Sequence, residues 1–232
     1  MALRILVKFP SRERPNKLKA SLANMMELAD DLENIHFLIS IDDDDPSMKW
    51  ALTAKFPKNV QVISGVSKNK THAVNRDIEL APAWDIVVQT SDDMKWIRQG
   101  WDTQIRNDYA KYFPDLDGAM HYPDGYMNDK LITLTILGSA YYKRDGYLYH
   151  PSYTTLFSDD ELTQVAKMRG KYKYVETTLF LHLNPFHTGE DGDDLHKKTQ
   201  DKTLATADYL NLEKRKKINF GLSDSEIVLK TF

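Results

Sequence analysis

The chain has 232 residues, 41% of them hydrophobic, which allows one compact domain that buries roughly 70% of its unfolded surface. With 34 acidic and 31 basic residues, the net charge of −3 gives no overall attraction to nucleic acid or anionic lipid. The absence of cysteine excludes disulfides and thiolate catalysis, and leaves carboxylate oxygen and histidine nitrogen as strong metal ligands. No apolar run is long enough for a signal peptide or a membrane span, so we expect a soluble, cytoplasmic protein.

Strand and helix alternate at the start of the chain. Residues 3–9 form an apolar run that predicts a buried strand, and a loop with Pro10 and Pro15 follows it. Apolar residues recur at helical spacing over 16–32, and a second apolar run at 35–41 predicts the next strand. This order is the βαβ pattern of a parallel sheet.

Four aspartates at 42–45 follow the second strand. Their mutual repulsion makes the loop costly unless a cation or a hydrogen-bond donor meets it, and the alternative is a solvated turn. The next residues predict a helix over 46–56, with Pro46 in its first turn, and a third strand at 60–64.

A basic segment at 64–76 leads into a helix that we expect to run to residue 81. Cations such as Lys70 and Arg76 near a helix start suit a diphosphate, because free backbone N–H groups and positive side chains act together. The same cations are also common on a solvated surface.

The next apolar run, at 84–90, stops abruptly before Asp92 and Asp93. Such a run is typical of a strand buried on both faces of a parallel sheet. The two carboxylates then lie at the carboxyl edge of the strand, where open α/β sheets bind ligands. They either hold a divalent metal or cap the following helix.

The second half of the chain has a different pattern. A turn signal at 123–126 separates two predicted strands, and the helix that follows them is rich in tyrosines. We expect Tyr141, Tyr142 and Tyr147 to pack in the core. The predicted elements are a helix at 99–113, strands at 117–122 and 131–137, and a helix at 138–149.

An acidic cluster then precedes a helical pattern that begins near residue 158. Ser158 and Glu161 have the spacing of a capping box, which does not require Asp159 and Asp160 as well. The two aspartates are therefore candidates for chemistry.

A last predicted strand at 177–183 contains His182, and His187 follows soon after it. A lone histidine in an apolar strand is more often a hydrogen-bonded core residue than a ligand. Beyond it we expect a loop at 189–194 and a polar helix at 195–215, followed by a basic run that suits the helix dipole, a phosphate-rich acceptor or a lipid surface.

From Pro10 to about His187, the order of these motifs resembles the family 2-like glycosyltransferases of the GT-A fold. The loop from Pro10 to Pro15 is similar to that family's first nucleotide loop, and Asp42-Asp43-Asp44 to its acidic loop. Lys70 to Asn75 resembles the stretch that approaches the diphosphate. Ser91-Asp92-Asp93 takes the place of the DxD signature with serine first, and Ser158-Asp159-Asp160-Glu161-Leu162 that of the E-D-x-D-L pattern, also with serine first.

The resemblance implies an α/β fold with a mainly parallel central sheet flanked by helices and a C-terminal helical extension. We expect a GT-A domain at 1–190, with a nucleotide-binding half at 1–98 and an acceptor-side half at 99–190, and an extension at 191–232.

The implied activity is metal-dependent, inverting transfer of a sugar from a nucleotide-diphosphate donor, a UDP-sugar by preference, to an acceptor hydroxyl. Asp159 or Asp160 is the implied base. Asp93 binds Mn²⁺ or Mg²⁺ with His182, or with His187 in reserve, and histidine favours manganese. The implied donor contacts are Pro10, Ser11, Arg12, Arg14, Asp42, Asp44, Lys70, Asn75, Arg76, Ser91, Asp92 and Asp124.

Two alternatives remain open at this point. The serines at Ser91 and Ser158 also fit a non-catalytic nucleotide-sugar binding module. A sugar nucleotidyltransferase fits less well, since the loop from Pro10 to Pro15 has no glycine. The acceptor is open among a saccharide, a lipid-linked glycan, a protein and a modified nucleic-acid base, and the oligomeric state is also open.

Overall fold

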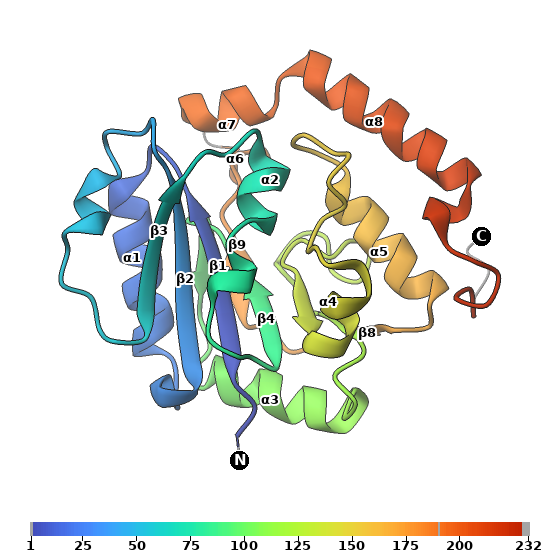
Figure 1. The fold of residues 1–232 in the computed structure, drawn as a ribbon, viewed down its shortest axis with the longest axis horizontal. Coiled ribbons are helices and arrows are strands. Elements are labelled where there is room, and N and C mark those ends of the chain that lie inside the picture. The colour runs from blue at the N-terminus through green and yellow to red at the C-terminus, as the bar shows by residue number, and fades with distance from the viewer. Residues whose placement is uncertain (1, 190, 229–232) are drawn as a thin grey trace.

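The protein is built on a seven-stranded sheet with helices on both faces (Figure 1). The computed structural model describes residues 2–189 and 191–228. The strands of this sheet are β1 (Ile5–Ser11), β2 (Ile35–Asp42), β3 (Val60–Gly65), β4 (Ile86–Gln89), β6 (Ala119–His121), β7 (Ile136–Gly138) and β8 (Tyr172–Tyr174). Their order is β3-β2-β1-β4-β7-β6-β8; the first four are parallel, and β7 is antiparallel to both β4 and β6. The predicted mainly parallel sheet is confirmed.

Helices cover both faces because successive side chains of a strand point to opposite sides of the sheet. Val7 and Phe9 pack with α1 and α3, whereas Leu6 and Leu38 pack with α2, α4 and α5. The helices are α1 (Pro15–Glu27), α2 (Lys70–Asn75), α3 (Trp101–Tyr112), α4 (Ser139–Asp145), α5 (Ser158–Met168), α6 (Pro185–Thr188), α7 (Asp194–Thr199) and α8 (Lys202–Lys217). Short 3₁₀ turns lie at Leu32–Asn34, Lys49–Leu52, Ile78–Leu80 and Asn219–Gly221.

A separate two-stranded ribbon joins distant parts of the chain. Its strands, β5 (Met94–Trp96) and β9 (Phe180–His182), are antiparallel, and Met94 is paired with His182. The strand predicted at 177–183 therefore exists in part, but it lies outside the large sheet. The sequence did not indicate β5 or β8.

The predicted helix at 46–56 is wrong, since a single 3₁₀ turn at Lys49–Leu52 is its helical part. Asp45 is 2% exposed, and its carboxylate accepts the backbone N–H groups of Glu13 at 2.6 Å and Ser47 at 3.0 Å. These bonds hold the chain as a turn, in competition with a regular helix.

The helix predicted to reach residue 81 breaks after Asn75. Asp77 has a φ of 72°, and its carboxylate lies 2.8 Å from Arg76 and 2.7 Å from the Ser40 hydroxyl. These partly buried polar contacts thus outweigh the helical pattern, and a short 3₁₀ turn at Ile78–Leu80 follows.

Three predictions for the second half also need correction. The predicted strand at 131–137 is reduced to β7, because the Ile132 N–H bonds the Thr163 hydroxyl at 3.0 Å. The capping box is absent, because Phe157 is the N-cap and Glu161 bonds Tyr153. The single helix predicted at 195–215 is two helices, because Asp201 caps α8.

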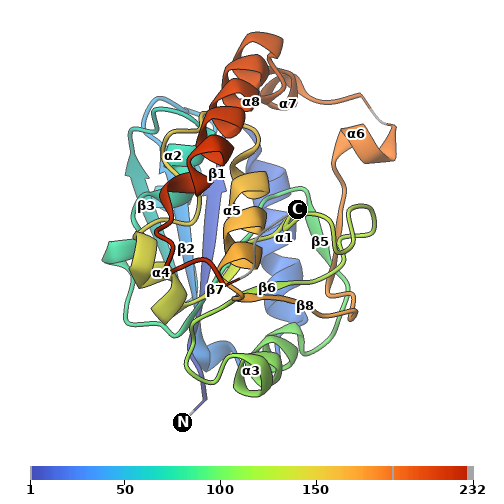
Figure 2. The same cartoon turned by 90° about the vertical axis from the view of Figure 1, so that its right-hand side faces the viewer.

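The C-terminal helices pack against the rest of the protein, although the predicted boundary near residue 190 stays a prediction. Leu212 of α8 and Phe220 beyond it form a buried cluster with Val165 and Met168 of α5. In Figure 2, α8 lies beside α5. Across the described ranges, every helix is too short or too polar to span a membrane.

A buried carboxylate on α3 binds both an arginine of the same helix and the loop before β2. The fully buried Asp102 carboxylate lies 2.5 Å from the Arg106 guanidinium and accepts the N–H groups of Asp30 at 2.9 Å and Asp31 at 3.0 Å. Replacing Asp102 with alanine leaves a buried cation and two N–H groups without their partner, and we expect the free energy of unfolding to fall by about 3–5 kcal/mol. Urea denaturation measures this loss. Glu33→Ala removes a carboxylate from an exposed position and is the control. An equal loss of stability in that variant would show that the buried contacts of Asp102 are not the cause.

Candidate active site

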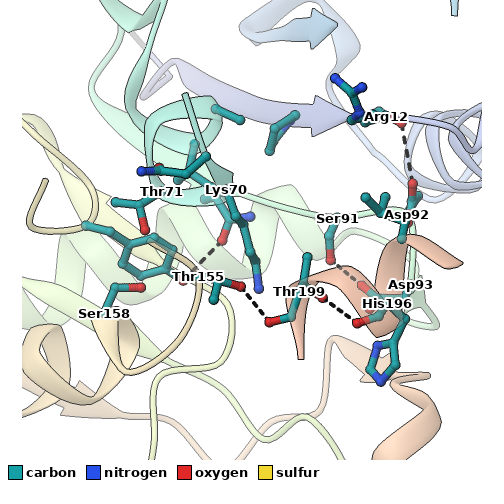
Figure 3. A pocket seen from close by; sticks show the side chains of 18 of the residues that line it. Arg12, Lys70, Thr71, Ser91, Asp92, Asp93, Thr155, Ser158, His196 and Thr199 are labelled. Carbon is teal, nitrogen blue, oxygen red and sulfur yellow. Dashed lines mark hydrogen bonds between the residues drawn. The ribbon is translucent and has the colours of Figure 1, made fainter. Parts of the chain in front are cut away.

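A cavity of about 420 Å³ lies at the carboxyl edge of β1, β2 and β4, where the loops after these strands meet α2, the start of α5 and α7 (Figure 3). The structure therefore brings together loops that are far apart in the sequence, as expected for a parallel sheet. The predicted site residues that line this cavity are Pro10, Ser11, Arg12, Arg14, Asp42, Lys70, Ser91, Asp92, Asp93, Asp159 and His182.

Arg12 is the cation that meets the four-aspartate loop. Its guanidinium lies 2.8 Å from Asp42 and 2.6 Å from Asp44. The repulsion among the aspartates is thus offset from within the protein. Asp42 is buried and lines the cavity, whereas Asp44 points to solvent and is held by Arg12.

Arg14 connects the loop at 91–93, which holds the candidate metal ligand Asp93, to the C-terminal segment. It lies 2.8 Å from Asp92 and 2.5 Å from Asp193, the residue that caps α7. Burial raises the pKa of Asp92, although the charge of Arg14 opposes the shift. Lys17 lies 3.2 Å from Asp193 and strengthens the link.

Asp93 and His182 face each other across the ribbon. His182 Nε2 lies 3.5 Å from an Asp93 oxygen, and Nδ1 lies 3.8 Å from the buried Asp124. Burial disfavours the charged imidazole, but the two carboxylates outweigh it and raise the pKa of His182 to about 9. Burial also disfavours the charged form of Asp93, but His182 and the Ser91 hydroxyl outweigh it and hold the pKa of Asp93 well below its usual range.

Asp124 does not line the cavity, and it acts behind His182. Its other oxygen accepts the N–H groups of Tyr126 at 2.8 Å and Met127 at 2.7 Å. A carboxylate on one imidazole nitrogen leaves the other nitrogen oriented for a ligand, which is the usual support for a metal-binding histidine.

The donor set fits a divalent cation that is completed by substrate oxygens. Asp93 offers carboxylate oxygen and His182 offers nitrogen, a mixture that suits Mn²⁺. Within residues 2–189 and 191–228, no three histidine or acidic side chains form a ready-made metal cluster, so a diphosphate and water would supply the remaining ligands. The α6 backbone includes His187, but the side chain of His187 lies outside the described part of the structure.

Asp159 and Asp160 occupy different places in the first turn of α5. Asp159 lines the cavity, and burial raises its pKa although the charge of Lys70 opposes the shift. Asp160 is not among the lining residues, and burial together with Asp159 raises its pKa to about 6. Lys70 also lines the cavity, and its positive charge acts to lower the pKa of both Asp93 and Asp159.

Asn75 and Arg76 lie beside the cavity and do not line it. Both side chains bind the backbone of neighbouring segments. The Asn75 amide donates to the Tyr149 carbonyl at 2.6 Å and accepts the N–H groups of Leu148 and Tyr149. Arg76 donates to the Ile41 carbonyl at 2.6 Å and pairs with Asp77. Their predicted contacts with a donor stay predictions.

The C-terminal segment supplies lining residues that the sequence did not indicate. Leu195, His196 and Thr199 on α7 line the cavity, and Figure 3 shows the last two. Burial and the nearby charge of Arg14 lower the pKa of His196. These positions lie beyond the part of the chain that resembles the family, and a polar helix without a motif gives no signal of a site.

No protein-family model matches the chain, and no curated protein sequence matches it. Several solved structures do match the chain. PcManGT, a mannosyltransferase from Pyrobaculum calidifontis in complex with GDP-Man and Mn²⁺, has a TM-score of 0.61 and 17% identity, over 80% of this chain and 58% of that one. TarS from S. aureus has a TM-score of 0.63 and 10% identity, over 84% and 41%. TarS 1–349 in complex with UDP-GlcNAc has a TM-score of 0.59 and 11% identity, over 77% and 57%.

At these identities the likeness shows the fold. The chain covers 58% of the mannosyltransferase and 41% of the longer TarS chain, so it spans part of each. The strand order and the cavity at the carboxyl edge of the sheet agree with that likeness. The chain has a GT-A-like glycosyltransferase fold.

Proposed function

We propose that the protein transfers a glycosyl group from a nucleotide-diphosphate sugar to an acceptor hydroxyl, with inversion and with Mn²⁺ or Mg²⁺. The observation that carries this proposal is the single cavity that unites Asp42, the Asp93–His182 pair and Asp159. Structures of the same fold in complex with GDP-Man and Mn²⁺, with UDP-GlcNAc and with UDP support a nucleotide-sugar donor.

The donor binds along the strand ends. Pro10, Ser11 and Asp42 surround the nucleoside end, and Arg12 and Arg14, each paired with at least two carboxylates, hold Asp42 and Asp92 in place at the same rim. Lys70 also lines the cavity, and its ammonium suits a diphosphate. A uridine diphosphate sugar is the preferred donor class.

Asp93 and His182 would hold the cation, with Asp124 orienting the imidazole. When bound, the divalent cation neutralises negative charge on the departing diphosphate. Lys70 adds positive charge to the same cavity, and Arg14 keeps Asp92 in place.

Asp159 is the proposed base, because it lines the cavity and Asp160 does not. Its carboxylate takes the proton of the acceptor hydroxyl while that oxygen attacks the anomeric carbon. The bond from this carbon to the diphosphate oxygen breaks, and the diphosphate leaves with the electron pair. Attack from the face opposite the leaving group inverts the configuration.

A screen of nucleotide sugars tests this proposal directly. We expect UDP or a UDP-sugar with Mn²⁺ to raise the melting temperature, because a ligand that binds the folded state stabilises it by mass action. Slow release of UDP from the sugar donor, with water as acceptor, should depend on Mn²⁺. Binding without release would support a nucleotide-sugar binding module, and stabilisation by nucleoside triphosphates alone would favour a nucleotidyltransferase. Sugar, lipid-linked, protein and nucleic-acid acceptors can then be compared by the rate of UDP release.

A further inference from the structure

A buried carboxylate on α8 binds the backbone of a loop beside the cavity. Asp208 is 2% exposed. Its carboxylate accepts three consecutive backbone N–H groups, from Thr154 at 2.9 Å, Thr155 at 2.8 Å and Leu156 at 3.0 Å. A buried carboxylate is costly unless it is hydrogen-bonded, and bonds to an ionised group are stronger than neutral ones. Asp208 therefore fixes residues 154–156 to α8.

The loop at 154–156 is one wall of the cavity. Thr155 and Leu156 line it. The Thr154 carbonyl accepts the N–H of Thr71 in α2 at 3.3 Å, and the Thr155 hydroxyl donates to the carbonyl of Thr199 in α7 at 2.8 Å (Figure 3). The wall is thus fixed to α2, α7 and α8 together.

The same loop leads directly to Asp159. Phe157, between the loop and α5, has a φ of 63°, a left-handed conformation that is unfavourable for a bulky residue. Surrounding contacts must hold such a turn. The orientation of the first turn of α5 therefore depends on how the loop before it is anchored.

A second contact from α8 holds the chain just after Asp159. Arg215 lies 2.5 Å from Glu161, which also accepts the hydroxyl of Tyr153 at 2.8 Å. Figure 2 shows α8 extending along α5, in agreement with these contacts. Polar contacts from α8 thus hold the chain both before and after the proposed base, Asp159.

We propose that Asp208 is a positioning residue: through the backbone of residues 154–156 it sets the place of the Asp159 carboxylate relative to the bound donor. This inference rests on the proposed function. It gives α8 a part in the reaction without contact with substrate, and α8 lies outside the part of the chain that resembles the family.

The test replaces Asp208 with asparagine. The side-chain amide has one oxygen acceptor in place of two, and its N–H₂ donor cannot accept the backbone N–H groups of the loop. We expect kcat for Mn²⁺-dependent UDP release to fall by about 10- to 100-fold, the size of effect that a misplaced reacting group produces. The Kd for UDP with Mn²⁺, measured by titration calorimetry, should stay within about twofold, because the groups proposed to hold the nucleotide lie on other loops. Hydrogen exchange at the amides of residues 154–156 should become faster.

Asp145→Asn is the matched control, since it weakens the partly buried pair with Arg169, 2.6 Å apart, at the other end of α5. Equal loss of kcat in both variants would overturn the positioning role, as would loss of UDP affinity in step with kcat. Unchanged exchange at 154–156 in Asp208→Asn would overturn the anchor itself. If instead the wild-type protein releases no UDP from any sugar donor, the proposed function fails.

Discussion

Asparagine in place of Asp93 is expected to lower Mn²⁺-dependent release of UDP by at least about 100-fold, as loss of a group that stabilises developing charge does in other enzymes. The variant keeps the size of the side chain and removes the charge that faces His182 across 3.5 Å. Steady-state kinetics with a Mn²⁺ titration measure the effect. Calorimetry with UDP should show a matching loss of Mn²⁺ affinity.

Asp224→Asn removes the same charge from an exposed position and should leave both measurements unchanged. If Asp93→Asn turns over donor at the wild-type rate with Mn²⁺ present, Asp93 does not hold the metal. His182→Ala offers a second test, because it should weaken Mn²⁺ binding in the presence of UDP without removing a carboxylate.

For Asp159, we expect substitution by asparagine to reduce kcat by about 10²- to 10⁴-fold, the range that general base catalysis contributes. The Kd for UDP with Mn²⁺ should stay within about twofold, because the loss concerns the proton of the acceptor. Single-turnover kinetics with an identified acceptor separate the chemical step from product release.

Asp160→Asn is the natural comparison, since it removes the neighbouring carboxylate, which does not line the cavity. Its kcat should change by less than about tenfold. The reverse pattern would make Asp160 the base. The anomeric configuration of the product, read by proton NMR, should be opposite to that of the donor, and retention would contradict a single displacement.

The centre of the sheet was predictable because β1, β2 and β4 are buried on both faces and leave nearly continuous apolar runs. Residues 3–9, 35–41 and 84–90 are runs of this kind, and each overlaps a strand. The short strands β5 and β8 contain lysine between aromatic or sulfur-containing residues, so no apolar run indicates them. The helix predicted at 46–56 failed because a side chain, Asp45, binds the backbone that the helix would need.

The positions of candidate site residues were predictable for side chains at strand ends. They were less predictable where tertiary contacts decide which way a side chain points. Parallel topology alone brings Ser11, Asp42 and Asp93 to one edge. The sequence does not reveal that Asn75 and Asp124 point into the protein, since amides and carboxylates bind backbone N–H groups as readily as ligands. Nor does it reveal that α7 covers the cavity, because that depends on the pairing of Arg14 with Asp193.

The β5–β9 ribbon also has a consequence for the order of events during synthesis. Its antiparallel register pairs Met94 with His182, and so brings His182 next to Asp93. Contacts between residues so far apart in the chain close a large loop and form late in folding. A nascent chain that has emerged only through β4 can pair its parallel strands, yet it lacks the histidine. We therefore expect affinity for a nucleotide with Mn²⁺ to arise only after β9 leaves the ribosome.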